Sequence, residues 1–228
     1  MNYDWILFDA DDTLFDFPAA ERDALESAAG ELGLDYSEEL LALYSAKNRQ
    51  VWRELERGEI DSAELRVRRF RLLFEELGDP VSSLDPALAS RIFVRHLARG
   101  TALLAGAQAL VTDLSSRYRL ALVTNGLAEV QRPRIEASAI NGAFESVFIS
   151  EELGAAKPSR AFFDLVFSAL GSPPRERVLL VGDSLTADVR GGLDYGLDTC
   201  WFDAKNAGTD LPVSYRITSL EELRAILL

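Results

Sequence analysis

Four aspartates stand just after two short apolar runs of the sequence. Asp9 and Asp11 follow the first of these runs, Asp183 follows the other after one glycine, and Asp188 comes shortly after it. Several carboxylates in one crevice repel one another unless a cation lies among them, and hard oxygen ligands favour Mg²⁺. The sequence therefore predicts a Mg²⁺ site if the two runs lie side by side in the fold.

A hydroxyl, an amide and an amine could complete a phosphate site around that ion. Thr124 and Asn125 follow another apolar run, and Lys157 precedes a proline. Lys157 could bind phosphate oxygens as a point charge, and the Thr124 hydroxyl could donate a hydrogen bond to them. A carboxylate can attack phosphorus to form an aspartyl-phosphate, and a second carboxylic acid can protonate the leaving oxygen and then deprotonate a water.

The positions of the aspartates suggest a role for each. Asp9 ends the first run, so we expect it to be the nucleophile, and Asp11 could lean over the same site as acid and base. Asp12 is expected, from a strand-like alternation, to point away and either to cap the next segment or to hold the loop. Asp183 is expected to bind the metal, and Asp188 to hold a metal-bound water or to orient Lys157.

Short apolar runs alternate with helical patterns along most of the chain. Continuous apolar runs of this length are typical of strands buried on both faces of a parallel sheet. The alternation predicts an α/β fold with right-handed crossovers, in which ligands bind at the carboxyl ends of the strands. The expected strands are residues 5–8, 120–123, 147–149 and 178–181, with 199–202 as a weaker case, and the expected helices are 107–114, 130–139, 159–170 and 185–195.

The first strand is followed by helices only. Amphipathic patterns separated by glycine or proline predict helices over residues 19–32, 37–57, 62–77 and 86–97. We interpret residues 17–100 as an all-helical insertion, and residues 1–16 and 101–228 as the core that carries the sheet. Within the insertion we expect the arginines at 66, 68, 69 and 71 to form a solvated helix face rather than a phosphate clamp. Tyr44, Asn48 and Trp52 are candidates for contacting a substrate, although Tyr44 and Trp52 also suit the core of the insertion.

Composition excludes several classes of partner and site. The chain has 228 residues, 24 Lys and Arg against 37 Asp and Glu, and a formal net charge of -13. A surface this acidic repels nucleic-acid polymers and anionic membranes. One Cys and one His exclude an internal disulfide, a cysteine-cluster metal site and a His-rich one. We find neither signal-peptide features nor an apolar stretch long enough for a membrane helix, so we expect a cytoplasmic protein.

Four short motifs occur in order along the chain and together resemble those of the haloacid dehalogenase-like (HAD) hydrolase superfamily. The motifs are FDADDTL at 8–14, TNG at 124–126, KP at 157–158 and GDSLTAD at 182–188. The resemblance implies a Rossmann-like core with a helical cap of the C1 type inserted between the first and second motifs. It also implies Mg²⁺ held by Asp9, the backbone carbonyl of Asp11 and Asp183, with Thr124 and Lys157 on the phosphate. The carboxylate at position 11 indicates phosphate transfer, because the dehalogenating members lack an acid there.

Other stretches are similar to the bacterial pyrimidine 5′-nucleotidase branch of that superfamily. They are Ala10 within the first motif, WRELERGEI at 52–60, ISEELGAAKP at 149–158 and LDTCWFDA at 197–204. This similarity implies a small phosphorylated metabolite as partner, namely a pyrimidine nucleoside 5′-monophosphate, and predicts no particular oligomeric state. The alternatives are a phosphatase for a sugar phosphate or phosphoglycolate, a phosphomutase, and a non-catalytic binding module.

Overall fold

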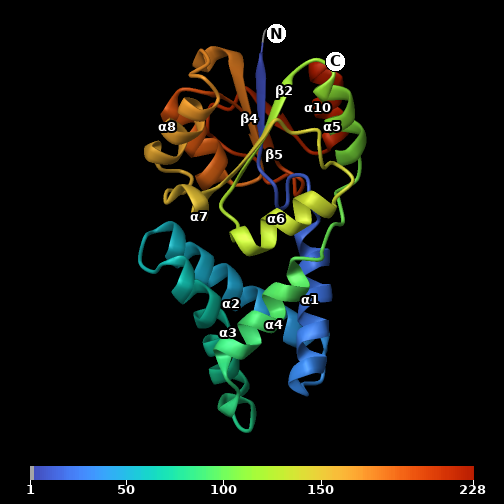
Figure 1. Ribbon diagram of the computed structural model, residues 1–228, viewed down its shortest axis with the longest axis vertical. Coiled ribbons are helices and arrows are strands. Elements are labelled where there is room, and N and C mark those ends of the chain that lie inside the picture. The colour runs from blue at the N-terminus through green and yellow to red at the C-terminus, as the bar shows by residue number, and fades with distance from the viewer. Residues whose placement is uncertain (1–2) are drawn as a thin grey trace.

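A six-stranded parallel sheet lies at the centre of the upper part of the protein in the computed structural model, which describes residues 3–228 (Figure 1). The strands are β1 (Trp5–Phe8), β2 (Arg119–Thr124), β3 (Ser146–Ile149), β4 (Val178–Gly182), β5 (Asp198–Phe202) and β6 (Tyr215–Ile217). Their order is β3-β2-β1-β4-β5-β6, and every neighbouring pair is parallel. The expected α/β fold is confirmed. The additional strand β6 was not expected, because only one of its three residues is buried and no apolar run marks it.

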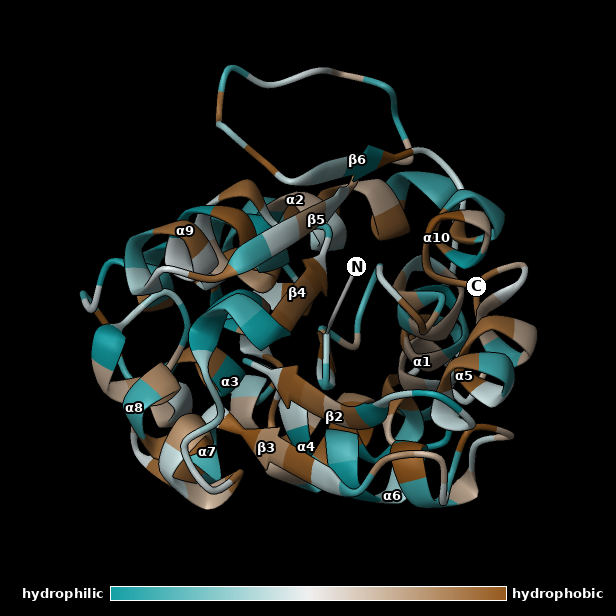
Figure 2. Ribbon diagram, turned by 90° about the horizontal axis from the view of Figure 1, so that it is seen from above, coloured by the Kyte–Doolittle hydropathy of each residue, from teal (hydrophilic) through white to brown (hydrophobic). Residues whose placement is uncertain are grey.

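Helices cover both faces of the sheet. They are α5 (Ala107–Ser115), α6 (Ala128–Ala137), α7 (Ser150–Leu153), α8 (Arg160–Ala169), α9 (Gly191–Tyr195) and α10 (Leu220–Leu227), with a π-helix at Leu185–Arg190 and a 3₁₀ turn at Arg175–Arg177. On β1, Ile6 and Phe8 pack with α5 and α10, whereas Trp5 and Leu7 pack with α8. Figure 2 shows α8 and α9 on one side and α5 and α10 on the other. Burial on both faces explains why the strands are continuously apolar.

Four further helices form a separate layer beneath the sheet (Figure 1). They are α1 (Phe17–Leu32), α2 (Glu38–Glu56), α3 (Ser62–Leu77) and α4 (Pro86–Leu97), with a 3₁₀ turn at Val81–Ser83. These helices share a hydrophobic cluster of their own, in which the ring of Tyr44 lies 4.9 Å from that of Phe93 and 5.2 Å from that of Phe70. No helix among the described residues is long and apolar enough to span a bilayer.

Three side chains of this helical layer differ in position from the expectations that placed them at a substrate or in solvent. Tyr44 and Asn48 are buried inside the helix bundle, at 0% and 2% exposure, so they do not face a substrate cavity. Arg69 is 1% exposed, and its guanidinium lies 4.9 Å from the centroid of the Phe93 ring. The expected solvated arginine face is therefore wrong at Arg69. Leucines four residues before and after it are buried, and positions spaced by four share one face of a helix.

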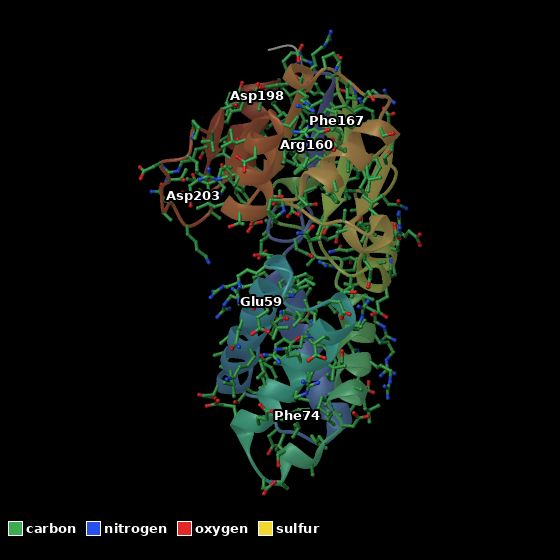
Figure 3. The ribbon with its side chains drawn as sticks, turned by 90° about the vertical axis from the view of Figure 1, so that its left-hand side faces the viewer. Glu59, Phe74, Arg160, Phe167, Asp198 and Asp203 are labelled. Atoms are coloured by element: carbon green, nitrogen blue, oxygen red, sulfur yellow. The ribbon has the colours of Figure 1, made fainter. Side chains whose placement is uncertain are left out.

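The chain passes between the sheet and the helical layer through two linkers that lie side by side. The backbone N–H of Asp16 donates to the carbonyl of Ala102 at 3.0 Å, and that of Leu104 donates to the carbonyl of Leu14 at 2.9 Å. Figure 3 shows Glu59, in the turn between α2 and α3, at the end of the helical layer nearest the sheet, and Phe74 toward its far end. The turn between α2 and α3 therefore faces the strand ends.

Candidate active site

All seven residues that the sequence predicts for a site line one cavity of about 230 Å³. They are Asp9, Asp11, Thr124, Asn125, Lys157, Asp183 and Asp188. The cavity lies where β1, β2 and β4 end, which is the edge of a parallel sheet at which ligands bind. Segments far apart in sequence therefore bring carboxylates, a hydroxyl, an amide and an amine together.

Lys157 forms the electrostatic centre of this cavity. Its Nζ donates to Asp9 Oδ1 at 2.7 Å, to Asp188 Oδ1 at 2.6 Å and to the carbonyl of Val123 at 2.8 Å. Burial lowers the pKa of Lys157, but the carboxylates of Asp188 and Asp9 more than offset this and hold the pKa above its usual value. The amine is therefore a buried, permanently charged cation with three fixed acceptors.

The last residue of β2 and the residue after it offer a donor and hold the lysine loop. The Asn125 side chain accepts from the backbone N–H of Lys157 at 2.9 Å and donates to the Lys157 carbonyl at 2.8 Å. Asn125 therefore fixes the backbone of the lysine. Thr124 Oγ1 accepts from the N–H of Gly126 at 3.0 Å, which leaves the hydroxyl hydrogen available for a ligand.

Three carboxylates meet closely enough to hold a cation. Oxygens of Asp9, Asp183 and Asp188 lie within 4.8 Å of one another. Burial raises the pKa of Asp183 to about 9, and the neighbouring carboxylates, Asp9 first, add to the rise. Burial likewise raises the pKa of Asp9 to about 7, against the lowering effect of Lys157. A divalent cation among these oxygens would relieve the repulsion, and an all-oxygen donor set suits Mg²⁺.

A glycine permits this close approach. A Cβ built on Gly182 would lie 2.3 Å from the carboxyl carbon of Asp188. Asp188 also accepts from the backbone N–H of Ser184 at 3.1 Å. The β4 end must therefore lack a side chain for the Asp188 carboxylate to reach Lys157.

Asp11 is held by a helix whose part in the site the sequence did not reveal. Its Oδ1 accepts from Arg134 Nη1 at 2.6 Å, and its Oδ2 accepts from Gln131 Nε2 at 2.6 Å, both on α6. Gln131 and Arg134 are 1% and 0% exposed. Two polar residues three apart on the helix after the TNG motif were the available signal, because they share a face.

Asp12 lies differently from the expectation. It lines the same cavity rather than pointing away from it, and its φ is 62°. The left-handed backbone departs from the strand-like alternation on which the expectation depended. Burial raises the pKa of Asp12 to about 6, and the Asp11 carboxylate adds to the rise.

The helical layer supplies one wall of the cavity. Phe17, Trp52 and Glu56 line it, and Trp52 and Glu56 also line an adjoining cavity of about 600 Å³ between the turn after α2 and the sheet. Of the three residues proposed for substrate contact, Trp52 alone faces these cavities. Burial raises the pKa of Glu56, and the Asp188 carboxylate adds to the rise.

The walls of the larger cavity combine apolar and acidic groups. Leu55 and Leu127 provide apolar surface beside Trp52, and the acidic lining residues are Glu56, Asp61 and Glu151. Lys157 is the one basic residue among the described residues that line either cavity. The space beyond Lys157 is therefore unfavourable for a second anionic group.

One arginine joins the helical layer to the sheet side of this cleft. Arg66 on α3 donates to Glu129 on α6 at 2.7 Å and to Glu151 on α7 at 2.8 Å. Ser62 Oγ also donates to Glu151 at 2.9 Å. Arg66 is thus neither part of a solvated face nor a phosphate ligand, because two carboxylates across the cleft take its donors.

Comparison with known protein families identifies the same family as the four motifs. The family model described as haloacid dehalogenase-like hydrolase matches residues 3–196. The chain belongs to this hydrolase family. The resemblance expected from the motifs is therefore confirmed.

Curated HAD relatives cover nearly the whole chain. The putative HAD-hydrolase YfnB of Bacillus subtilis is 37% identical over 99% of this chain and 95% of its own length. Pyrimidine 5′-nucleotidase YjjG of Escherichia coli is 32% identical over 100% and 99%, and pyrimidine 5′-nucleotidase PynA of Streptococcus pneumoniae is 34% identical over 98% and 94%. Two of these three relatives are thus nucleotidases.

A solved HAD structure matches the whole fold. The crystal structure of YfnB from Bacillus subtilis bound to magnesium has a TM-score of 0.92 and 36% identity, over 100% of this chain and 99% of that one. A dehalogenase structure at 19% identity, with a TM-score of 0.75, shares the fold. The Rossmann-like HAD architecture expected from the motifs is confirmed.

Proposed function

We propose that this HAD hydrolase is a Mg²⁺-dependent phosphomonoesterase that acts through an aspartyl-phosphate on Asp9, with pyrimidine nucleoside 5′-monophosphates as substrates. The observation that carries the proposal is the buried Lys157 amine, 2.7 Å from Asp9 and 2.6 Å from Asp188 in an acidic cavity. A fixed cation beside a carboxylate can bind a phosphate oxygen while the carboxylate attacks phosphorus. A non-catalytic binding module has no need of such a nucleophile.

The bond changes follow from these positions. An oxygen of Asp9 attacks phosphorus, the bond from phosphorus to the leaving oxygen breaks, and Asp11 gives that oxygen a proton. Asp11 then takes a proton from water, the water oxygen attacks phosphorus, and the bond between phosphorus and the Asp9 oxygen breaks, so that phosphate leaves and the Asp9 carboxylate is restored. Thr124 and Lys157 bind the other phosphate oxygens in both steps.

The metal site follows from the same donors. We propose that Asp9, the backbone carbonyl of Asp11 and Asp183 hold Mg²⁺, while Asp188 orients Lys157. The ion neutralises charge on the phosphate oxygens when bound. The close approach of the Asp9 and Asp183 oxygens within one acidic cluster supports these two ligands, because all-oxygen donor sets suit a hard cation.

The walls of the cleft support a neutral leaving group with a flat ring. Trp52, Leu55 and Leu127 offer apolar surface on which a base can stack. Glu56, which has no basic partner among the described residues of the cleft, would repel the carboxylate of phosphoglycolate or a second phosphate. A nucleoside satisfies both conditions, and two of the curated relatives are pyrimidine 5′-nucleotidases.

We propose that residues 17–100 act as a cap over a core of residues 1–16 and 101–228. The cap side chains Phe17, Trp52 and Glu56 in the cavity support this role, as does the ion pair between Arg66 and Glu151 across the cleft. A cap in this place would exclude water and position the leaving group.

A phosphate-release screen tests the proposal. UMP and dTMP are compared with phosphoglycolate and with sugar phosphates, in Mg²⁺ and after EDTA, and Asp9→Asn serves as the inactive control. We expect release from the nucleotides, loss with EDTA and recovery on adding Mg²⁺. Release from sugar phosphates or phosphoglycolate but not from UMP or dTMP would refute the nucleotidase assignment. Metal-independent turnover, or near-normal activity of the Asp9 variant, would refute the mechanism.

A further inference from the structure

Arg134 connects Asp11 with both linkers between the sheet and the helical layer. Its Nη1 donates to Asp11 at 2.6 Å, its Nε donates to the carbonyl of Gly100 at 2.7 Å, and its guanidinium lies 4.8 Å from the centroid of the Phe15 ring. Phe15 lies in the first linker, between β1 and α1, and Gly100 lies in the second, between α4 and α5. One buried side chain therefore contacts Asp11 and both connections at once.

Gln131 completes the arrangement from the same helix. It donates to the second carboxylate oxygen of Asp11, so both oxygens of Asp11 have buried donors on α6. A Cβ built on Gly126 would lie 2.2 Å from Gln131 Nε2, so the glycine of the TNG motif leaves the space that Gln131 occupies. Asp11 is not among the three carboxylates, Asp9, Asp183 and Asp188, whose oxygens lie within 4.8 Å of one another. The side chain of Asp11 is thus oriented by α6.

We propose that Arg134, supported by Gln131, is a positioning residue that orients Asp11 for proton transfer and couples that orientation to the linkers of the helical layer. The inference rests on the proposed function, because it assigns Asp11 the transfer of a proton to the leaving oxygen. The cost of burying a guanidinium supports a specific role, since a charged side chain with no exposure requires fixed partners. Arg134 itself need not touch the substrate.

A positioning role predicts a dependence on the leaving group. An alkoxide leaves only with a proton, whereas p-nitrophenolate leaves without one. Loss of Arg134 should therefore lower kcat for UMP more than kcat for p-nitrophenyl phosphate, with KM for both nearly unchanged. General acid catalysis contributes about 10²–10⁴-fold, so partial misplacement of Asp11 should reduce kcat for UMP about 10- to 100-fold.

The experiment compares Arg134→Gln and Arg134→Lys with a matched control, Arg69→Lys. Arg69 is also buried and stacked on an aromatic ring, but it belongs to the core of the helical layer. Arg134→Lys should recover part of the UMP activity, because it keeps the charge. Arg69→Lys should leave the UMP-to-aryl ratio of kcat unchanged. If the phosphate-release screen selects another alkyl monoester, that ester replaces UMP.

A double-mutant cycle separates positioning from mere stability. In an Asp11→Asn background, Arg134→Gln should produce no further loss of aryl phosphate turnover. An equal loss in both backgrounds, or an unchanged leaving-group ratio in a folded Arg134→Gln variant, would overturn the inference while leaving the phosphatase assignment intact. A wild-type chain that hydrolyses no phosphomonoester would refute the proposed function, and this inference with it. Should Arg134→Gln fail to fold, Arg134→Lys and Gln131→Ala are judged by the same ratio.

Discussion

Replacing Lys157 with methionine should lower the free energy of unfolding by much more than the loss of one exposed charge would. The substitution keeps an unbranched side chain of similar length but removes the amine that lies 2.7 Å from Asp9 and 2.6 Å from Asp188. The lysine side chain is 1% exposed, and those of the two aspartates are 11% and 2% exposed, so water cannot replace the lost cation. Removing one partner of a buried pair costs about 3–5 kcal/mol, because the remaining charge stays buried and uncompensated.

The loss should also grow with pH. Burial already raises the pKa of Asp9 to about 7, and Lys157 opposes that rise. Without the amine, the folded chain holds the Asp9 proton to still higher pH, whereas the unfolded chain releases it near the ordinary value. A folded state that binds more protons than the unfolded state loses stability as pH rises. We therefore expect a larger loss at about pH 8 than at about pH 5.

Urea denaturation in EDTA measures both effects, since a bound cation would mask them. Lys47→Met is the matched control, because Lys47 pairs with Glu76 at 3.1 Å at the surface, where such a pair contributes about 0–1 kcal/mol. A Lys157→Met variant that loses no more stability than the Lys47→Met control, or whose loss is independent of pH, would refute the electrostatic account of the site.

Other substitutions probe the metal cluster, the cleft and the β4 end. The pKa of Asp183 in the fold is raised to about 9, so without divalent cations the folded chain keeps this proton while the unfolded chain releases it, and stability falls as pH rises toward that value. Asp183→Asn should flatten this loss of stability in urea melts. Glu56→Gln should raise kcat/KM for phosphoglycolate relative to UMP, whereas Glu59→Gln, at an exposed pair with an arginine, should leave the ratio unchanged. Gly182→Ala should displace Asp188, whose carboxyl carbon would lie 2.3 Å from the new methyl group, and should lower kcat more than tenfold. An active Gly182→Ala variant with unaltered kcat would contradict this packing argument.

The strands and the residues at their ends were predictable for one physical reason. A central parallel strand is buried on both faces, so its sequence is a continuous apolar run that ends where the polar site begins. Asp9, Thr124 and Asp183 could be placed in one crevice because parallel strands end at a common edge. The segment around Lys157 could be placed there by the family motif, although no strand ends at the lysine itself.

The orientation of side chains on helices was less predictable. Tyr44 and Trp52 are both aromatic residues of α2, yet one is buried in the helix bundle and the other lines the cleft. Their positions depend on how α2 is rotated against its neighbours, and the hydrophobic pattern of one helix does not define that rotation. The partners of Asp11 were not predicted for a similar reason. Arg134 lies far from Asp11 in sequence, and the two side chains meet only because of tertiary packing.

The pairing of the two linkers limits how the helical layer can move. Backbone hydrogen bonds join Asp16 to Ala102 and Leu104 to Leu14, so the two connections form a short antiparallel ribbon. Two unpaired linkers would let the helical layer twist relative to the sheet, whereas two hydrogen-bonded linkers resist twisting and bend mainly perpendicular to the plane of their hydrogen bonds. If α1 to α4 move relative to the sheet while these hydrogen bonds persist, bending of the paired linkers is easier than twisting, so the same side chains would face the cleft after each movement.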